Sequence, residues 1–115
     1  MSPKSHNREL GRRQGHARIF AALGDETRLA LVAKLGGGAS RSISQLTRGS
    51  RLTRQAITKH LRVLERAKVV CSLRSGRENL FQLNPKPMEE ITQYLEFVST
   101  RWDQALSRLK SFVED

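Results

Sequence analysis

The stretch that decides the fold spans residues 42–70, SISQLTRGSRLTRQAITKHLRVLERAKVV. Ser42, followed three residues later by Gln45, forms the capping-box pattern that begins a helix. Gly49 ends this helix after a few residues, and Thr53 supplies the N-cap of a second helix. Two helices joined by a short glycine-containing turn predict a helix-turn-helix motif.

The second helix of this motif is predicted from Thr53 to Arg66. Ile57, Leu61 and Leu64 follow one another at spacings of four and three residues, which places them on one face of an α-helix and in the core. The opposite face carries Arg54, Gln55, Thr58, Lys59, Arg62 and Arg66.

This polar face is strongly basic, because seven Arg or Lys residues lie between positions 48 and 68 and Glu65 is the only acid there. Arg pairs with guanine edges and Gln with adenine edges, whereas Thr and Lys bind mainly phosphates. The first turns of such a helix enter the major groove most deeply. Base contacts are therefore expected from Arg54, Gln55, Thr58 and Lys59.

Three further positions of this helix have less direct roles. Thr53 is expected to cap the helix, to bind a phosphate, or both. Arg62 is expected to contact a phosphate, and Arg66 lies too far along the helix. His60 lies at the edge of the core, where a lone histidine is more often a packing or hydrogen-bonding residue than a metal ligand.

A β-hairpin is predicted after this helix. Residues 69–73 and 80–83 are rich in strand formers, and Arg74-Ser75-Gly76-Arg77 forms a turn between them. A hairpin in this position is the wing of a winged helix. Arg74, Ser75 and Arg77 are candidates for contact with the minor groove or its phosphates, and an ordinary solvated turn is the alternative.

Helices are predicted on both sides of this region. One extends from about Gln14 to Gly24, and the next is capped by Asp25 and stopped by the glycines at 36–38. A last helix follows Pro87 and is about 40 Å long. The fold class is therefore mainly α with a small β-hairpin, in the order α-α-α-α-β-β-α.

The last helix carries an apolar stripe that is longer than a small winged domain can cover. We expect part of it to pack against the same helix of a second copy. The stripe residues assigned to this dimer contact are Ile91, Leu95, Val98, Trp102, Leu106 and Leu109.

Length and charge agree with a single DNA-binding domain. The chain has 115 residues, and 21 Lys and Arg against 11 Asp and Glu give it a formal net charge of +10, which favours a polyanionic partner. Residues 1–14 are interpreted as a flexible basic tail, or alternatively as an arm that contacts phosphates, and residues 15–115 as the winged-helix domain. The start lacks the apolar segment of a secretory signal, and we expect a cytoplasmic protein without a membrane partner.

Neither a metal site nor an enzyme is expected. Cys71 is the only cysteine and is interpreted as inert core, and the histidines at 6, 16 and 60 are scattered. No paired carboxylates in a plausible pocket and no Cys-His pair are found. Gly36-Gly37-Gly38 follows a helix instead of a strand, which is the wrong setting for a phosphate-binding loop. We expect no catalytic residue, no metal and no cofactor.

The chain resembles the ArsR-type winged-helix repressors through three segments: ALGDETRLALVAKL at 22–35, the stretch at 42–70, and GRENLFQLNPKPMEEI at 76–91. It differs at Lys68-Val69, where the family often has Gly-Leu. The resemblance implies a homodimer joined by the first helix, with Phe20, and the last helix. It also implies an operator with imperfect two-fold symmetry, repression by blocking promoter access, and DNA contacts from the segment 53–60, including His60.

Many members of this family sense metals through Cys-x-Cys motifs or through His and carboxylate pairs on the last helix. This sequence has neither, and it resembles the branch without these ligands. Two alternatives stay open: a metal- or redox-responsive repressor of the same fold, and a basic winged-helix module that binds RNA or a protein. The operator, the effector and the choice between repression and activation are not determined by the sequence.

Overall fold

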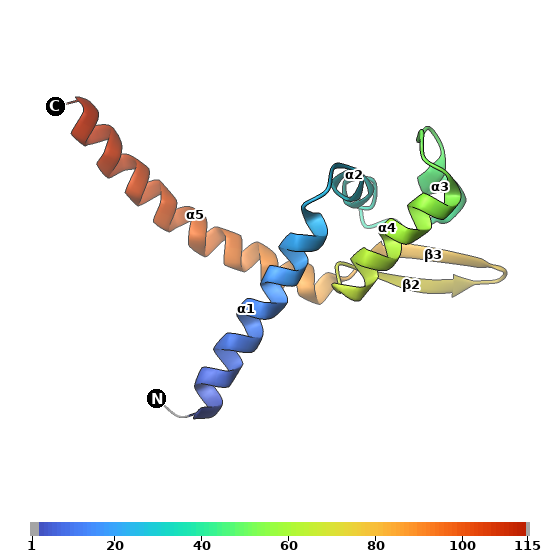
Figure 1. Cartoon of the computed structure of the whole chain (residues 1–115), viewed down its shortest axis with the longest axis horizontal. Coiled ribbons are helices and arrows are strands. Elements are labelled where there is room, and N and C mark those ends of the chain that lie inside the picture. Colours follow the sequence, from blue (N-terminus) through green and yellow to red (C-terminus); the bar gives the residue numbers. More distant parts are fainter. Residues whose placement is uncertain (1–2, 115) are drawn as a thin grey trace. The chain divides into compact units, whose positions relative to one another are not determined.

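The computed structural model describes the backbone of residues 3–114 and the side chains of Arg8 and residues 10–114. Its elements are α1 Pro3–Leu23, α2 Glu26–Lys34, β1 Arg41–Ser42, α3 Ile43–Thr47, α4 Arg54–Arg66, β2 Val70–Ser75, β3 Glu78–Leu83 and α5 Pro85–Glu114 (Figure 1). The chain divides into two units, of which the first ends at Asn84 and the second consists of α5 and the last residue. The mainly helical fold with a small antiparallel sheet confirms the predicted fold class.

Each of the three short helices of the first unit begins at the polar residue that the sequence predicts. The Asp25 carboxylate accepts a hydrogen bond from the Arg28 backbone N–H at 3.0 Å. Ser42 and Gln45 form both bonds of the capping box, at 3.1 and 2.9 Å. Thr53 Oγ1 accepts the Ala56 N–H at 3.1 Å. These bonds satisfy backbone donors that lack a partner in the first turn of a helix.

The core of the first unit forms around α4. Its residues Ile57, Leu61 and Leu64 are all at most 1% exposed, which confirms the predicted apolar face. The other fully buried side chains are Leu35 directly after α2, Leu46 in α3, Val69 directly before β2, and Val70 and Phe81 in the sheet. Burial of this face fixes which side of α4 remains in contact with solvent.

The sheet has a third strand that the sequence did not predict. Its order is β1-β3-β2, and β1 pairs antiparallel with β3 through Arg41 opposite Phe81 and Ser42 opposite Leu80. A strand of two residues is too short to display the alternation that identifies strands. Ser42 both pairs in the sheet and caps α3, so β1 connects the sheet directly to the first helix of the helix-turn-helix motif.

The wing turn is tighter than expected. β2 continues to Ser75 and β3 begins at Glu78, and these two residues pair across the hairpin. Only Gly76 and Arg77 connect them, and Gly76 has φ of +61°. A positive φ at the first of two loop residues is the pattern of a type II′ turn, which matches the twist of the strands. Arg74 and Ser75 therefore lie in β2 and not in the turn.

The first helix is longer than predicted. We expected a flexible tail over residues 1–14 and a helix from about Gln14, whereas α1 begins at Pro3. Residues 1 and 2 lie outside the described residues, and the expected boundary after residue 14 falls inside the helix. Most residues of this segment are good helix formers, and proline is favoured at a first helical position. The basic composition of the segment therefore did not predict its helical backbone conformation.

α5 forms the second unit and has 30 residues, which corresponds to a length of about 45 Å. Ile91 is 6% exposed, but the large apolar residues that follow it are mostly exposed, among them Trp102 at 63% and Phe112 at 82%. Neither α5 nor any other helix within residues 3–114 is long and apolar enough to cross a membrane.

Candidate nucleic-acid interface

The amino end of α4 presents an exposed and positively charged surface. Arg54, Gln55 and Lys59 are exposed, and the first turn contains no acidic residue. The partial positive charge of the helix N-terminus is therefore not neutralised by a neighbouring side chain. The turn between α3 and α4 contains Gly49, which has φ of +79°, and a hydrogen bond from the Leu52 N–H to Ser50 Oγ at 3.0 Å. These features hold the chain where α4 begins.

Thr58 lies on the same helix one turn after Arg54. Its hydroxyl donates to the Arg54 carbonyl oxygen at 2.7 Å, so its proton is bound within the helix. The methyl group and an oxygen lone pair remain for a ligand. Thr58 can therefore accept a hydrogen bond or contact an apolar group, but in this arrangement it does not donate to a phosphate.

Arg62 and Arg66, further along α4, are both bonded within the protein. Arg62 Nη1 lies 2.9 Å from Glu65 Oε1, and Ser72 Oγ donates to Glu65 Oε2 at 2.8 Å. The Ser72 hydroxyl and then Arg62 hold the pKa of Glu65 below its ordinary value. Arg66 Nε donates to the Arg62 carbonyl oxygen at 3.4 Å. A phosphate bound by Arg62 would have to compete with Glu65.

His60 lies against α2. Its Nδ1 is 3.3 Å from Arg28 Nη1 and 3.8 Å from Asp25 Oδ2, and its side chain is 24% exposed. Arg28 Nε also donates to the carbonyl oxygen of Ala22 near the end of α1. These contacts favour the packing interpretation of His60 and join α1, α2 and α4.

Asp25 and Arg28 were not among the predicted site residues, although both lie in the quoted segment 22–35. Asp25 caps α2 and faces His60, while Arg28 bonds to two other helices. The hydrogen bond from the Arg28 backbone N–H, aided by the Arg28 charge, lowers the pKa of Asp25. Asp25 and Arg28 therefore help to position α4.

The predicted wing residues Arg74, Ser75 and Arg77 are all exposed. Arg74 Nε donates to the Gly76 carbonyl oxygen at 3.4 Å, which holds this side chain near the turn. In Figure 1 the β2–β3 hairpin projects away from the end of α4 that precedes it. The arginines are thus placed at the tip of a projecting hairpin.

Lys68 follows the carboxyl end of α4 and has a backbone conformation that is unusual for lysine. This residue has φ of +66°, a conformation that favours glycine. Its N–H donates to the Glu65 carbonyl at 3.0 Å, and the Val69 N–H donates to the Leu64 carbonyl at 2.9 Å. These are the two bonds of a Schellman motif. The turn from α4 into the wing is therefore a regular Schellman motif, with lysine at the position where glycine is favoured.

The remaining polar groups do not gather into a further site. Cys71 is a half-buried free thiol, and Gln82 Nε2 lies 3.7 Å from its sulfur. Across residues 3–114, insofar as their side chains are described, no group of three or more His, Cys, Asp or Glu residues could hold a metal ion.

The predicted dimer residues fall into two groups. Ile91 is buried already in the single chain and can add little new area to a contact between copies. Val98 is half-buried, and the other five members of the prediction are exposed: Phe20, Leu95, Trp102, Leu106 and Leu109. The exposed members on α5 are those available to a partner.

Comparison with known proteins identifies the family. Residues 23–70 match the model of a helix-turn-helix domain. The chain is 33% identical over 84 residues to the HTH-type transcriptional regulator Rv2034 of Mycobacterium tuberculosis, covering 73% of this chain and 78% of the relative.

Solved structures are similar over almost the whole chain. An ArsR-like transcriptional regulator from Rhodococcus sp. RHA1 is 34% identical, with a TM-score of 0.70 over 89% of this chain and 95% of that one. The homodimeric winged helix-turn-helix DNA-binding domain Mb0332 of Mycobacterium bovis has the same fold at 18% identity, with a TM-score of 0.66 and coverage of 94% and 93%. The chain therefore belongs to the ArsR-type winged helix-turn-helix transcriptional regulators.

Proposed function

We propose that this regulator is a homodimeric repressor that binds a two-fold-symmetric operator through α4 and blocks access to the promoter. The observation that carries the proposal is the amino-terminal half of α4, where Arg54, Gln55 and Lys59 are exposed opposite the buried face and the first turn has no acidic residue. A regulator of this kind acts where the DNA is, in the cytoplasm.

Sequence-specific contacts are assigned to the first turns of α4. Arg54 and Gln55 are exposed at the end that enters the major groove in helix-turn-helix proteins. Both side chains can form paired hydrogen bonds with a single base. Of the other two expected base contacts, Lys59 is assigned a phosphate instead, because lysine binds mainly phosphates, and Thr58 can contact the methyl group of thymine.

Contacts outside the major groove are assigned to the wing and to the α4 cap. Arg74 and Arg77 are exposed at the hairpin tip, where their charges suit the narrow and negative minor groove. Thr53 and the first backbone N–H groups of α4 offer a phosphate site. Arg62 is assigned a minor part because of its bond to Glu65.

The two copies are proposed to join through α5. Leu95, Trp102, Leu106 and Leu109 succeed one another at spacings of seven, four and three residues and are all exposed. A helix face of this length, left uncovered, favours a second copy as its partner. The homodimeric assembly of the Mycobacterium bovis domain supports this proposal.

The test is a comparison of dissociation constants for three duplexes of equal length at two salt concentrations. These are DNA from upstream of the protein's own gene, shuffled DNA and RNA. The upstream fragment should bind about a thousand-fold more tightly than shuffled DNA. Equal affinity for RNA would contradict the proposal.

A pair of matched variants identifies the surface involved. Lys59→Gln removes one exposed charge from α4, and Lys110→Gln removes one exposed charge from α5. Only Lys59→Gln should weaken binding and flatten the dependence on salt, because it alone releases a phosphate contact. Equal losses in both variants would mean that binding depends only on net charge.

A further inference from the structure

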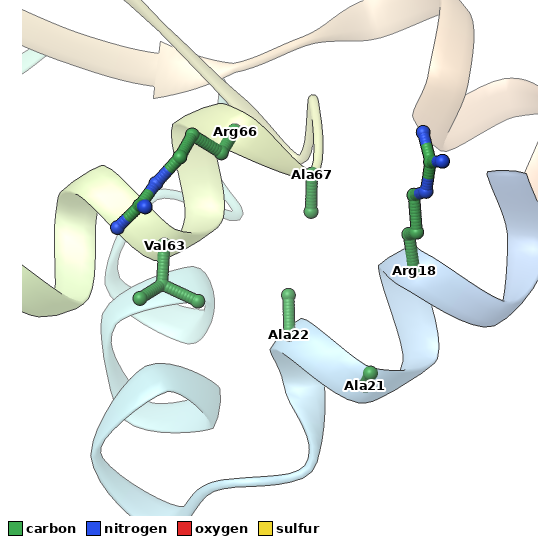
Figure 2. Close-up of a pocket in the computed structure, with 6 residues that line it drawn as sticks. All are labelled: Arg18, Ala21, Ala22, Val63, Arg66 and Ala67. Atoms are coloured by element: carbon green, nitrogen blue, oxygen red, sulfur yellow. The ribbon is translucent and has the colours of Figure 1, made fainter.

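An open groove lies between the carboxyl-terminal part of α1 and the end of α4. It has a volume of about 410 Å³ and is lined by Arg18, Ala21, Ala22, Val63, Arg66 and Ala67. All six residues belong to the first unit of the chain. Figure 2 displays the Ala22 and Ala67 methyl groups facing each other across the groove, with Arg18 and Arg66 on opposite sides.

The lining combines a small apolar floor with two cations. Three alanines and one valine provide apolar surface without filling the space, and no lining residue is acidic. A ligand that matches this surface has an apolar body and a negative charge.

Both guanidinium groups retain donors for such a charge. Among the described side chains, no hydrogen bond or ion pair involves Arg18, and Arg66 uses only Nε, in a 3.4 Å bond to a backbone oxygen. Glu65, the acid next to Arg66 in the sequence, is already bonded to Arg62 and Ser72. Each guanidinium has five N–H donors in a fixed geometry that suits a carboxylate.

We propose that this groove binds an amphipathic organic anion, with its apolar part on Ala21, Ala22 and Ala67 and its carboxylate bonded by Arg18 or Arg66. The occupant is a small molecule and not a protein, because only six residues line the groove.

The groove also provides a means of regulation, and this step rests on the proposed function. One wall is α1 and the other is the last turn of α4, whose first turns are assigned to DNA. A ligand that contacts both walls favours one placement of α4 relative to α1. It changes DNA affinity to the extent that it binds the free and DNA-bound arrangements with different affinity.

Binding is tested on the full chain by NMR with ¹³C-methyl alanine and no DNA present. Sodium decanoate is the probe, and decyltrimethylammonium, with the same chain and the opposite charge, is its control. Decanoate should produce saturating shifts at the Ala21, Ala22 and Ala67 methyl groups, and the cation should bind at least about tenfold more weakly. Shifts confined to Ala105 on α5, equal binding of the two amphiphiles, or no saturating shift would overturn the site.

Two variants link the shifts to the groove. Ala21 is exposed, so Ala21→Leu occupies the groove without entering the core, whereas Ala30→Leu makes the same change at an exposed position of α2. Ala21→Leu should reduce decanoate affinity about tenfold, and Ala30→Leu should leave it unchanged. Equal affinity in both variants would place the ligand elsewhere.

A DNA-binding assay with decanoate separates the site from its regulatory role. If the proposal is correct, decanoate changes the DNA affinity of the wild type and has less effect on Ala21→Leu. Decanoate bound in the groove with no change in DNA affinity would overturn the regulatory role and leave the site intact. A protein that binds decanoate but no DNA would overturn the proposed function instead.

Discussion

α4 and α5 are both amphipathic helices, but they differ in what covers their apolar faces. In α4, Ile57, Leu61 and Leu64 are buried by the rest of the first unit. In α5, only Ile91 is buried, and residues such as Trp102 remain exposed. The same periodic pattern therefore identifies an apolar face in both helices without identifying its partner.

The difference between the two apolar faces separates residues that stabilise one chain from residues that join two copies. A covered face such as that of α4 contributes to the folding of one chain, and its burial leaves the opposite face for a ligand. An uncovered face such as that of α5 contributes only when another surface meets it. Substitutions on the apolar face of α4 should therefore change the free energy of unfolding of one chain, whereas substitutions on the apolar face of α5 should change the association of two copies.

The largest effect is expected in the core of α4. Leu61→Ala should lower the free energy of unfolding by about 2–5 kcal/mol, because Leu61 is completely buried and the substitution leaves a cavity. The loss should be the same at all protein concentrations. Leu106→Ala on α5 is the matched control, and its smaller effect should depend on concentration. A concentration-independent loss of the same size at Leu106 would remove the distinction between the two helices.

The next effect concerns the association of two copies. Trp102→Ala should weaken the dimer by about 3 kcal/mol, or roughly a hundredfold in dissociation constant, because a large exposed side chain loses its proposed partner surface. Sedimentation equilibrium measures this change. Gln104→Ala, also exposed on α5 but away from the stripe, should have no effect. An unchanged dimer in Trp102→Ala would assign Trp102 to another role.

The polar face of α4 should show a smaller and more selective effect. Gln55→Ala should cost about 1–3 kcal/mol in binding to the specific site and should relax the base preference. Binding constants for the operator and for single-base variants measure both effects. If the affinity falls equally for all sequences, Gln55 contacts the phosphate backbone and not a base.

The end of α4 offers a gain in stability. Lys68→Gly should raise the free energy of unfolding by about 1 kcal/mol, because glycine adopts the positive φ of this position without strain. Chemical denaturation measures the change. Lys68→Ala retains the strain and should not stabilise the protein. An equal gain in both variants would attribute the effect to the lysine side chain and not to the backbone.

The smallest effect is the pH dependence at the start of α2. The pKa of Asp25 is lowered from its ordinary value of 3.8, chiefly by the Arg28 N–H. Its contribution to stability is therefore present above that value and is lost as the pH falls through the lower folded value. Asp25→Asn keeps a capping side chain but should reduce this dependence in acid unfolding measurements. An acid unfolding profile of Asp25→Asn identical to that of the wild type would contradict this role of the Asp25 carboxylate.

The sequence predicted the parts of the fold whose signals are local. The caps Asp25, Ser42 and Thr53 and the buried face of α4 are confirmed, because each depends on residues a few positions apart. β1 was missed because its pairing with β3 joins segments about 40 residues apart. The predicted start of α1 was wrong because the basic composition of residues 1–14 indicates a tail, whereas most of these residues are good helix formers.

The candidate site was predicted less completely for the same reason. The exposure of Arg54, Gln55 and Lys59 follows from the helical period. The contacts of His60 with Asp25 and Arg28 instead depend on the packing of α4 against α2, which no local pattern reveals. The bond of Arg62 to Glu65 could have been anticipated from their spacing of three residues on one helix.

The measurement that tests the central claim most directly is hydroxyl-radical footprinting on the DNA upstream of the protein's own gene. Two copies joined through α5, each with α4 in a major groove, should protect two symmetric half-sites about one turn of DNA, roughly 10 base pairs, apart. Leu106→Glu should abolish the protection of both half-sites together. Protection of a single half-site, or protection that persists in Leu106→Glu, would contradict the account.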